Sequence, residues 1–447
     1  MSPVEKLAGW GKMAPVQARV ARPVSTDAAA LLLPAAGPRG TLARGLGRAY
    51  GDAAQNADSD VADLTGLDRV LHFDRVRGVA RVEAGLSLDA LMRLVVPRGW
   101  FPAVTPGTRY VTVGGAIAAD VHGKNHHRDG SFVNHVESFT LATPRCTVDV
   151  TPESDPDLFW GTAGAMGLTG FVTEATLRLL PIETAMIRVD TERAEDLDDV
   201  MSRMVDGDHR YRHSVAWVDM FARGRRMGRS VLTRGDHARA EDLPASSRRD
   251  PLAFSPSAPF AAPPWVPTWL LNRLTVGAFD ELYFRRAPRV RCDEIVGITP
   301  FFHPLDAVRG WNRLYGAPGF FQYQFVVPDE AAHAVRAVVE RVSSRRCAFL
   351  AVLKRFGPGN PGPLSFPRPG WTLAMDMPAR ADRHGFLASL DRIVADAGGR
   401  LYLAKDSRVS PEMLREMIPD LDRFEALRDR VDPERVLQSD LSRRLRL

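Results

Sequence analysis

Short stretches of alternating hydrophobic and polar residues recur in the middle of the chain and predict an antiparallel sheet. The clearest are residues 214–221 (SVAWVDMF), 319–328 (GFFQYQFVVP), 347–357 (CAFLAVLKRFG) and 370–378 (GWTLAMDMP). Alternation with a period of two places successive side chains on opposite faces of a strand. Two stretches with a helical period, 329–344 and 381–398, lie among these strands. The pattern therefore predicts antiparallel strands with helices between them.

The first part of the chain has a different pattern, with short β-branched strands, glycine-rich turns and short helices from about Gly40 to Leu180. Residues 80–99 predict a strand, a glycine turn and a helix capped by Ser87. From Arg400 the chain returns to short elements and ends in a basic helix. These changes of texture, in a chain of 447 residues, predict more than one domain.

One segment, residues 222–269, has no core pattern. It begins with ARGRRMGR and contains six prolines between Pro251 and Pro267. The composition predicts a mobile insertion. The functional alternative is a lid or a lipid-facing loop, because apolar side chains lie beside positive charge, namely Phe254, Phe260, Trp265 and Trp269.

Composition excludes several classes of protein. Hydrophobic residues make up 45% and charged residues 25%, as in ordinary globular proteins. No apolar run reaches the roughly 20 residues of a membrane helix, and the N-terminus has no apolar signal region. Three widely spaced cysteines indicate reduced thiols. The net charge of +5 does not indicate a nucleic-acid partner.

Only five of the 59 basic residues are lysine: Lys6, Lys12, Lys124, Lys354 and Lys405. A lysine ammonium can shift its pKa when buried, which a guanidinium cannot do. Lys405 follows the predicted strand in LYLAKDSR (401–408), where a structural pair with Asp406 is the alternative to a functional role.

Two glycine-rich segments predict close approach of backbone to a ligand. In RGLGRAYGDAAQN (44–56), Gly45, Gly47 and Gly51 favour either a phosphate cradle or a plain turn. In residues 105–127, Gly114-Gly115 begins a helix whose positive end suits a pyrophosphate. His122 and its polar neighbours then suggest a cofactor wall, a solvated loop or a metal site. No carboxylate or cysteine completes a ligand spacing, and Lys124 would repel a cation.

These strings resemble the vanillyl-alcohol-oxidase type of FAD flavoprotein and, more closely, the decaprenylphosphoryl-β-D-ribose 2-oxidase family. The resemblance covers nearly the whole chain, through GLGRAYGDAAQN, PGTRYVTVGGAIAADVHGKNHH, GLTG, FFHPLD, GFFQYQFVVP, PLSFPRPGW and LYLAKDSR. It implies an α+β fold with a two-part FAD-binding domain and an antiparallel-sheet substrate (cap) domain. The implied bounds are 1–182 for the FAD-binding domain, 183–399 for the substrate domain and 400–447 for the return to the first domain.

By resemblance, FAD would be held by Gly45, Gly47, Arg48, Ala49, Tyr50, Gly51, Pro106, Gly107, Thr108, Gly114, Gly115, His122, Gly123, Asn125, His126, Gly170 and Lys405. The first glycine segment has no histidine, which relatives with covalent flavin use there. We therefore expect FAD to be bound non-covalently, and no metal.

The family's reaction is oxidation of the 2-hydroxyl of a polyprenylphosphoryl ribose to a ketone, in arabinan precursor synthesis. The resemblance implies catalytic roles for Lys405, His122 and Tyr50, with the choice of base between Lys405 and His122 left open. The substrate would contact Trp217, Gln322, Gln324, Lys354, Thr372 and Ala374. Core packing is the alternative for Trp217, and ordinary sheet polarity for the two glutamines.

Thr372, Ala374 and Val215 depart from the asparagine, cysteine and serine of the family pattern, so the exact sugar is less well indicated than the chemistry. An oxidase of another sugar, alditol or aldonolactone is the alternative, and a non-enzymatic lipid-binding module is the third. The resemblance also implies an NADH-dependent short-chain reductase as partner and contact with a membrane surface. We expect a cytoplasmic protein, peripheral at the inner membrane, with the cell envelope as the alternative.

Overall fold

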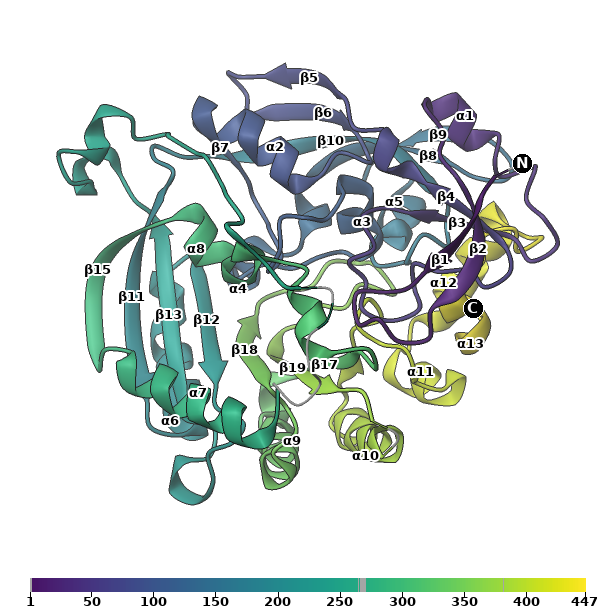
Figure 1. Cartoon of the computed structure of the whole chain (residues 1–447). Coiled ribbons are helices and arrows are strands. Elements are labelled where there is room, and N and C mark those ends of the chain that lie inside the picture. Colours follow the sequence, from purple (N-terminus) through teal and green to yellow (C-terminus); the bar gives the residue numbers. More distant parts are fainter. Residues whose placement is uncertain (1, 264, 266–270, 381) are drawn as a thin grey trace.

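A computed structural model describes residues 2–263, 265, 271–380 and 382–447. In these residues the strands form a four-stranded, a six-stranded and an eight-stranded sheet and one two-stranded pair (Figure 1). Helices lie on and between the three larger sheets (Figure 1). The predicted α+β class with a large antiparallel sheet is confirmed.

The four-stranded sheet begins the chain and has the order β1-β2-β4-β3. Its strands are β1 (Val4–Leu7), β2 (Val16–Ala21), β3 (Thr41–Arg44) and β4 (Asp60–Asp63), with α1 (Thr26–Ala30) packed beside them. β2, β3 and β4 are parallel, and the loop after β3 is the first glycine segment. At the free edge of β3, Thr41 forms a parallel bridge with Leu437, so the end of the chain extends this sheet.

The six-stranded sheet has the order β5-β6-β10-β8-β9, with β7 paired to the end of β10. Its strands are β5 (Val70–Asp74), β6 (Val79–Glu83), β7 (Trp100–Pro102), β8 (Val136–Ala142), β9 (Thr147–Val150) and β10 (Phe171–Pro181). The helices that follow or cover it are α2 (Leu88–Val95), α3 (Val113–Ala118), α4 (His126–Asp129) and α5 (Pro156–Thr162). Ser87 caps α2 as predicted, accepting a hydrogen bond from the Ala90 amide. A hydrophobic core fills the space between this sheet and α2, α3 and α5.

The eight-stranded sheet is antiparallel throughout and has the order β15-β11-β13-β12-β18-β19-β17-β20. Its strands are β11 (Met186–Ala194), β12 (His213–Val218), β13 (Ser230–His237), β15 (Val290–Gly297), β17 (Phe320–Val327), β18 (Leu350–Phe356), β19 (Gly370–Pro378) and β20 (Arg400–Leu401). Leucine, valine and methionine side chains of α6 (Leu197–Gly207), α9 (His333–Arg345) and α10 (Arg383–Asp396) pack on one face. The opposite face is left for α7 (Arg273–Arg286), α8 (Ile298–Phe302) and a cavity.

After β20 the chain crosses back and ends in α11 (Pro411–Met417), α12 (Leu421–Val431) and α13 (Asp440–Leu445). Arg428 of α12 and Asp432 are both fully buried and paired at 3.0 Å. Asp432 also accepts hydrogen bonds from the Val436 and Leu437 amides, at 2.7 and 2.9 Å. This buried pair therefore shapes the turn that brings Leu437 to the edge of β3.

The predicted insertion at 222–269 is wrong in its first part, because residues 230–237 form β13 in the interior of the large sheet. The strand was missed because Arg234 interrupts the apolar pattern of the segment. In the structure Arg234 is buried and forms an ion pair with Glu192 of β11.

The next part of the predicted insertion is held by hydrogen bonds to α2 and to the segment before β11. The Pro256 carbonyl accepts a hydrogen bond from Arg93 at 2.8 Å, and the Pro251 carbonyl accepts one from the Ala185 amide at 2.7 Å. Further on, β14 (Phe260–Ala261) pairs with β16 (Val308–Arg309). Residues 264 and 266–269, including Trp269, lie outside the described residues. A role of this segment as a lid or a lipid-facing loop stays a prediction.

Candidate active site

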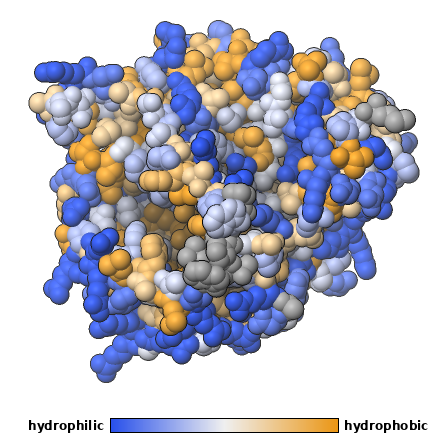
Figure 2. All heavy atoms as spheres, in the orientation of Figure 1, coloured by the Kyte–Doolittle hydropathy of each residue, from blue (hydrophilic) through white to orange (hydrophobic). Residues whose placement is uncertain are grey.

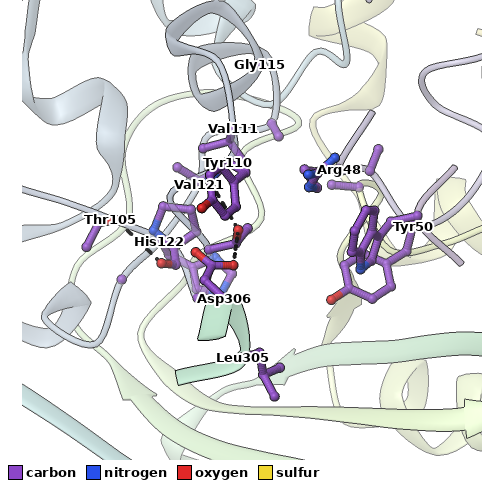
Figure 3. Close-up of a pocket in the computed structure, with 18 of the residues that line it drawn as sticks. Arg48, Tyr50, Thr105, Tyr110, Val111, Gly115, Val121, His122, Leu305 and Asp306 are labelled. Atoms are coloured by element: carbon purple, nitrogen blue, oxygen red, sulfur yellow. Dashed lines mark hydrogen bonds between the residues drawn. The ribbon is translucent and has the colours of Figure 1, made fainter. Parts of the chain in front are cut away.

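A cavity of about 1010 Å³ lies between the two glycine segments and the inner face of the eight-stranded sheet. Its volume is at the upper end of the roughly 300–1,000 Å³ that small-molecule sites occupy. Figure 2 shows a hollow lined by hydrophobic atoms on the face that also carries α7 and α8. In Figure 3, Arg48 and Tyr50 of the first segment face Tyr110, His122 and Asp306 across a gap.

The first glycine segment is pressed against the second. A Cβ atom on Gly45 would lie 2.3 Å from the Thr112 hydroxyl oxygen, and Gly47 has a φ of +64°. Glycine is the residue that tolerates both conditions. Arg48 lies over the Trp10 ring at 4.1 Å and lines the cavity, so this segment brings a cation to the cavity wall.

The second glycine segment begins α3 at the cavity. The Thr112 hydroxyl accepts a hydrogen bond from the Gly115 amide at 3.1 Å, which fixes the start of the helix. Gly107 lies in the preceding turn, where a Cβ atom would meet nothing within 4 Å. Gly107, Gly114 and Gly115 all line the cavity. Their bare backbone forms a cradle that larger residues would fill.

His122 follows α3 and is buried against the large sheet. Its Nε2 lies 2.9 Å from the side-chain nitrogen of Gln324, which therefore donates a hydrogen bond to it. Burial, reinforced by Lys354, holds the pKa of His122 well below its ordinary value, so the ring is neutral. Within the described residues its Nδ1 has no hydrogen-bond partner. His122 therefore contributes a neutral ring to the cavity wall, with its Nδ1 buried and without a partner among the described residues.

Lys405 enters the cavity from the loop after β20. Its Nζ lies 3.7 Å from the centre of the Tyr50 ring, so the LYLAKDSR loop contacts the first glycine segment. Burial lowers the pKa of Lys405 to about 7; the Asp376 carboxylate opposes that change and Lys354 adds to it. Near neutral pH a substantial fraction of Lys405 is therefore uncharged and able to accept a proton.

Behind Tyr50 lies a buried polar chain. Gln322 donates a hydrogen bond of 2.6 Å to the Asp376 carboxylate, and the Tyr315 hydroxyl lies 3.5 Å from the other carboxylate oxygen. Burial raises the pKa of Asp376 to about 7, against the opposing effect of Gln322 and Lys405. Asp376 was not among the predicted site residues. The signal was present, since Asp376 interrupts the apolar positions of GWTLAMDMP in β19.

Two further lysines lie close by. Burial lowers the pKa of Lys354, on β18, to about 8. Burial, together with Lys354, lowers the pKa of Lys124 to about 7. The Lys124 ammonium also donates a hydrogen bond to the Phe301 carbonyl. Three of the five lysines of the chain therefore line one cavity, which gives it a positive potential.

Most of the predicted site residues line this cavity. Those from the cofactor set are Gly45, Gly47, Arg48, Ala49, Tyr50, Pro106, Gly107, Thr108, Gly114, Gly115, His122, Gly123, Gly170 and Lys405. Those from the substrate set are Trp217, Gln322, Gln324, Lys354 and Ala374. Trp217 packs its ring against Tyr283 of α7 at 4.8 Å, on the cavity side of the sheet, and is not buried in the core.

Four predicted residues do not line the cavity. Asn125 donates hydrogen bonds to the Ala103 carbonyl and to Asp129, so it shapes the turn. His126 packs on Phe356, with ring centres 4.4 Å apart. Thr372 is fully buried and accepts a hydrogen bond from Gln324 at 3.3 Å. Gly51 lies against the Asp406 backbone. Each can act on the cavity only through a neighbour.

Asp306 joins the cavity wall in the FFHPLD string. It accepts a hydrogen bond from the Thr108 hydroxyl at 2.7 Å and one from the Arg109 amide at 2.9 Å. It therefore fixes the turn that presents Gly107. Among the described residues there is no group of three or more histidine, cysteine, aspartate or glutamate side chains that could hold a metal ion.

Comparisons with known proteins agree with this geometry. Residues 17–151 match the family described as FAD binding domain, and residues 372–445 match the D-arabinono-1,4-lactone oxidase family. The first match contains both glycine segments, and the second contains Ala374 and Lys405.

Three relatives cover most or all of the chain. It is 43% identical to the decaprenylphosphoryl-β-D-ribose oxidase of Mycolicibacterium smegmatis, over 99% of this chain and 98% of the relative. It is 44% identical to an uncharacterized protein of Streptomyces coelicolor, over 81% of this chain and 100% of the relative. It is 26% identical to the L-gulono-1,4-lactone dehydrogenase of Mycobacterium tuberculosis, over 100% of this chain and 99% of the relative.

Proposed function

The chain belongs to the family of the decaprenylphosphoryl-β-D-ribose oxidases, and we propose that it oxidises the 2-hydroxyl of a polyprenylphosphoryl-β-D-ribose to the 2-keto sugar. It is an oxidoreductase with an FAD-binding domain. The observation that carries the proposal is the meeting of Lys405, Tyr50 and His122 around one cavity that is walled by both glycine segments.

The residues of the cavity fit FAD. The bare backbone at Gly107 leaves room for a pyrophosphate, Gly114 and Gly115 also line the cavity, and Arg48 supplies a compensating charge. The FAD is held non-covalently in this proposal. In support, the described residues lining the cavity include no cysteine and a single histidine, His122, which follows α3 and lies outside the first glycine segment.

When bound, FAD supplies the acceptor for the hydride that leaves the carbinol carbon. Lys405 takes the hydroxyl proton on its neutral Nζ, because its lowered pKa places the uncharged form near neutral pH. His122 Nε2 already accepts the Gln324 hydrogen bond, so its remaining proton lies on the buried Nδ1. Through that hydrogen bond His122 positions Gln324, which lines the cavity. Tyr50 packs on Lys405 and holds its stem in place.

The sheet side of the cavity supplies the substrate contacts. Lys354 is the cation for the lipid phosphate, since it lies on the inner face of β18 among apolar residues. Gln322 and Gln324 offer amides to the sugar hydroxyls, and Trp217 offers an apolar wall. Ala374 leaves more room than the family's cysteine does, so a bulkier sugar substituent is tolerated there.

A substrate comparison tests this function. The purified protein is expected to be yellow, with a flavin spectrum that is bleached by polyprenylphosphoryl ribose under anaerobic conditions. Free ribose, alditols and aldonolactones at equal concentration are expected to bleach it at least about 100-fold more slowly, because remote binding energy is lost. Faster reduction by an aldonolactone or alditol would favour the alternative oxidase. A colourless protein that retains lipid would favour a lipid-binding module.

The product defines the partner. A 2-keto sugar becomes an arabinose donor only after reduction from the opposite face, so an NADH-dependent short-chain reductase is the proposed partner. Among the described residues, none of the helices combines the length and the apolar character needed to cross a bilayer. A cytoplasmic location, peripheral at the inner membrane, is proposed with the cell envelope as the alternative. Accumulation of the ketone in cells that lack such a reductase would support the assignment.

The pH dependence of the reaction tests the role of Asp376. In the unaltered protein the rate is expected to fall below about pH 7, because Lys405 becomes protonated. The titratable groups around Lys405 are Tyr50, His122, Lys354 and Asp376. Asp376→Asn removes the one that favours the protonated lysine, so the fall moves to lower pH by about one unit. The exposed Asp206→Asn is the control. An unmoved profile in Asp376→Asn would contradict this role.

A further inference from the structure

Helix α7 exposes several large hydrophobic side chains to solvent. Leu274 is 84% exposed and Leu282 50% exposed, on the side opposite to the buried Val276, Asp280 and Phe284. Isolated exposed hydrophobic residues are ordinary, but a row of them along one helix marks a contact surface. In Figure 2, hydrophobic and hydrophilic atoms alternate along the region where Figure 1 places α7.

The same helix borders the mouth of the cavity. Phe279 and Tyr283 line the cavity and are still 58% and 42% exposed, so they lie at its opening. Leu305, which is also partly exposed, lies on the rim. Phe279 and Tyr283 therefore connect the apolar lining of the cavity to the outer surface of α7.

Positive charge gathers at both ends of α7. Arg285 and Arg286 end the helix. The nearby acid, Glu281, already pairs with Arg229 and Arg285, at 2.5 Å each, and Asp280 is buried. The outward face therefore combines hydrophobic side chains with arginines and carries little free negative charge. This is the composition of helices that lie in an anionic bilayer interface.

A second cavity lies at the start of α7. It has a volume of about 360 Å³, and its wall contains four arginines: Arg273, Arg346, Arg380 and Arg383. Arg383 is 5% exposed, and its Nε has no hydrogen-bond partner among the described residues. The acid near it is Asp382, 3.8 Å from one guanidinium nitrogen. Four guanidinium groups around one small cavity suit a phosphate oxyanion.

We propose that α7 is the membrane-docking helix of this protein, with Leu274 and Leu282 entering the interface of an anionic bilayer and the four-arginine cavity receiving a lipid phosphate. The occupant is a phospholipid bilayer, because exposed apolar side chains lie between arginines at the two ends of one helix and that helix borders the cavity mouth. The docking explains how a membrane-anchored polyprenyl chain reaches the cavity, and this part rests on the proposed function. A lipid substrate would then pass from the bilayer along Phe279 and Tyr283.

Vesicle binding tests the proposal with the purified, flavin-loaded protein. Unaltered protein is expected to float with phosphatidylglycerol vesicles and to bind phosphatidylcholine vesicles at least about tenfold more weakly, since each arginine gains from an anionic surface. Leu274→Ser/Leu282→Ser is expected to weaken binding to both vesicles by about tenfold. Arg273→Gln/Arg346→Gln is expected to weaken binding to the anionic vesicles alone, and added salt to mimic it.

The β5–β6 hairpin provides a matched control. Val76 is 89% exposed and lies between two exposed arginines, Arg75 and Arg77. Val76→Ser and Arg75→Gln/Arg77→Gln are expected to leave vesicle binding unchanged. Equal losses in these controls, or no flotation of the unaltered protein, would overturn the proposal. Circular dichroism and the flavin spectrum verify that each variant is folded.

Two further measurements distinguish bilayer docking from self-association, and failure of the docking proposal from failure of the proposed function. If the Leu274→Ser/Leu282→Ser variant changes the molar mass in light scattering, the face joins two copies of the chain and the bilayer assignment is wrong. Oxidation of a short-chain, water-soluble phosphoryl ribose should be unaffected by these substitutions. If the unaltered protein does not oxidise that substrate, the proposed function fails, whereas vesicle flotation still decides the docking surface.

Discussion

Replacing Lys405 by methionine is expected to lower kcat by about 10²- to 10⁴-fold, the range that a general base contributes. Methionine keeps much of the length of the lysine stem over the Tyr50 ring but cannot accept a proton. The polyprenylphosphoryl ribose should still bind, because Lys354 remains as the phosphate partner, so KM is expected to change by less than about fivefold. Anaerobic flavin reduction in a stopped-flow instrument measures the chemical step directly.

Two control variants separate proton transfer from charge. Lys405→Arg keeps the positive charge, but a guanidinium is always protonated at the pH of the assay, so this variant should be as slow as methionine. Lys6→Met, on β1 and away from the cavity, should behave like the unaltered protein. Recovery of near-normal turnover by Lys405→Arg would show that the positive charge suffices and that Lys405 is not the base.

Asp432→Asn is expected to lower the free energy of unfolding by about 3–5 kcal/mol, because it leaves the buried Arg428 guanidinium without its counter-charge. The carboxylate also accepts the Val436 and Leu437 amides, so the turn toward β3 loses its anchor. Chemical denaturation followed by circular dichroism measures this loss. Flavin should be released at a lower denaturant concentration than in the unaltered protein, since Thr41 and Leu437 lie close to the first glycine segment.

The matched control lies on the same helix. Asp429 forms an ion pair with Arg435 at 2.6 Å, and both side chains are substantially exposed. Asp429→Asn should cost less than about 1 kcal/mol, as surface ion pairs do. A similar loss in both variants would indicate that the helix itself, and not the buried pair, governs the stability.

Local patterns sufficed for much of the fold. The alternation in residues 319–328 and 370–378 predicts β17 and β19, which pair along their full length. The cap at Ser87 predicts the start of α2. The pattern failed at β13, where Arg234 and Gly235 interrupt the alternation, because the ion pair with Glu192 that allows burial is formed only in the folded sheet. Which strand neighbours which is likewise set by long-range packing, not by local sequence.

The candidate site shows the same limit. Glycine positions and lysine scarcity pointed to Gly107, Gly114 and Lys405, because backbone freedom and a rare side chain are visible in a sequence. The contact of Lys405 with Tyr50 joins residues about 350 positions apart, and only the family resemblance placed them in one site. Asp376 was missed for a related reason: an acid in a strand gives no local sign of facing a lysine from another element. His122 and His126 both pack on Phe356, but only His122 also lines the cavity, a difference that their spacing in the sequence does not show.

The bridge between Thr41 and Leu437 joins positions about 400 residues apart, so residues that are synthesised late complete the first sheet. Lys405 also emerges late. During synthesis, the eight-stranded sheet and its helices can form before the first sheet gains its final edge, because domains fold as units as they emerge. The nascent chain would then present an unfinished strand edge beside β3 for most of translation. The cavity gains its full wall only after Lys405 has emerged, long after both glycine segments.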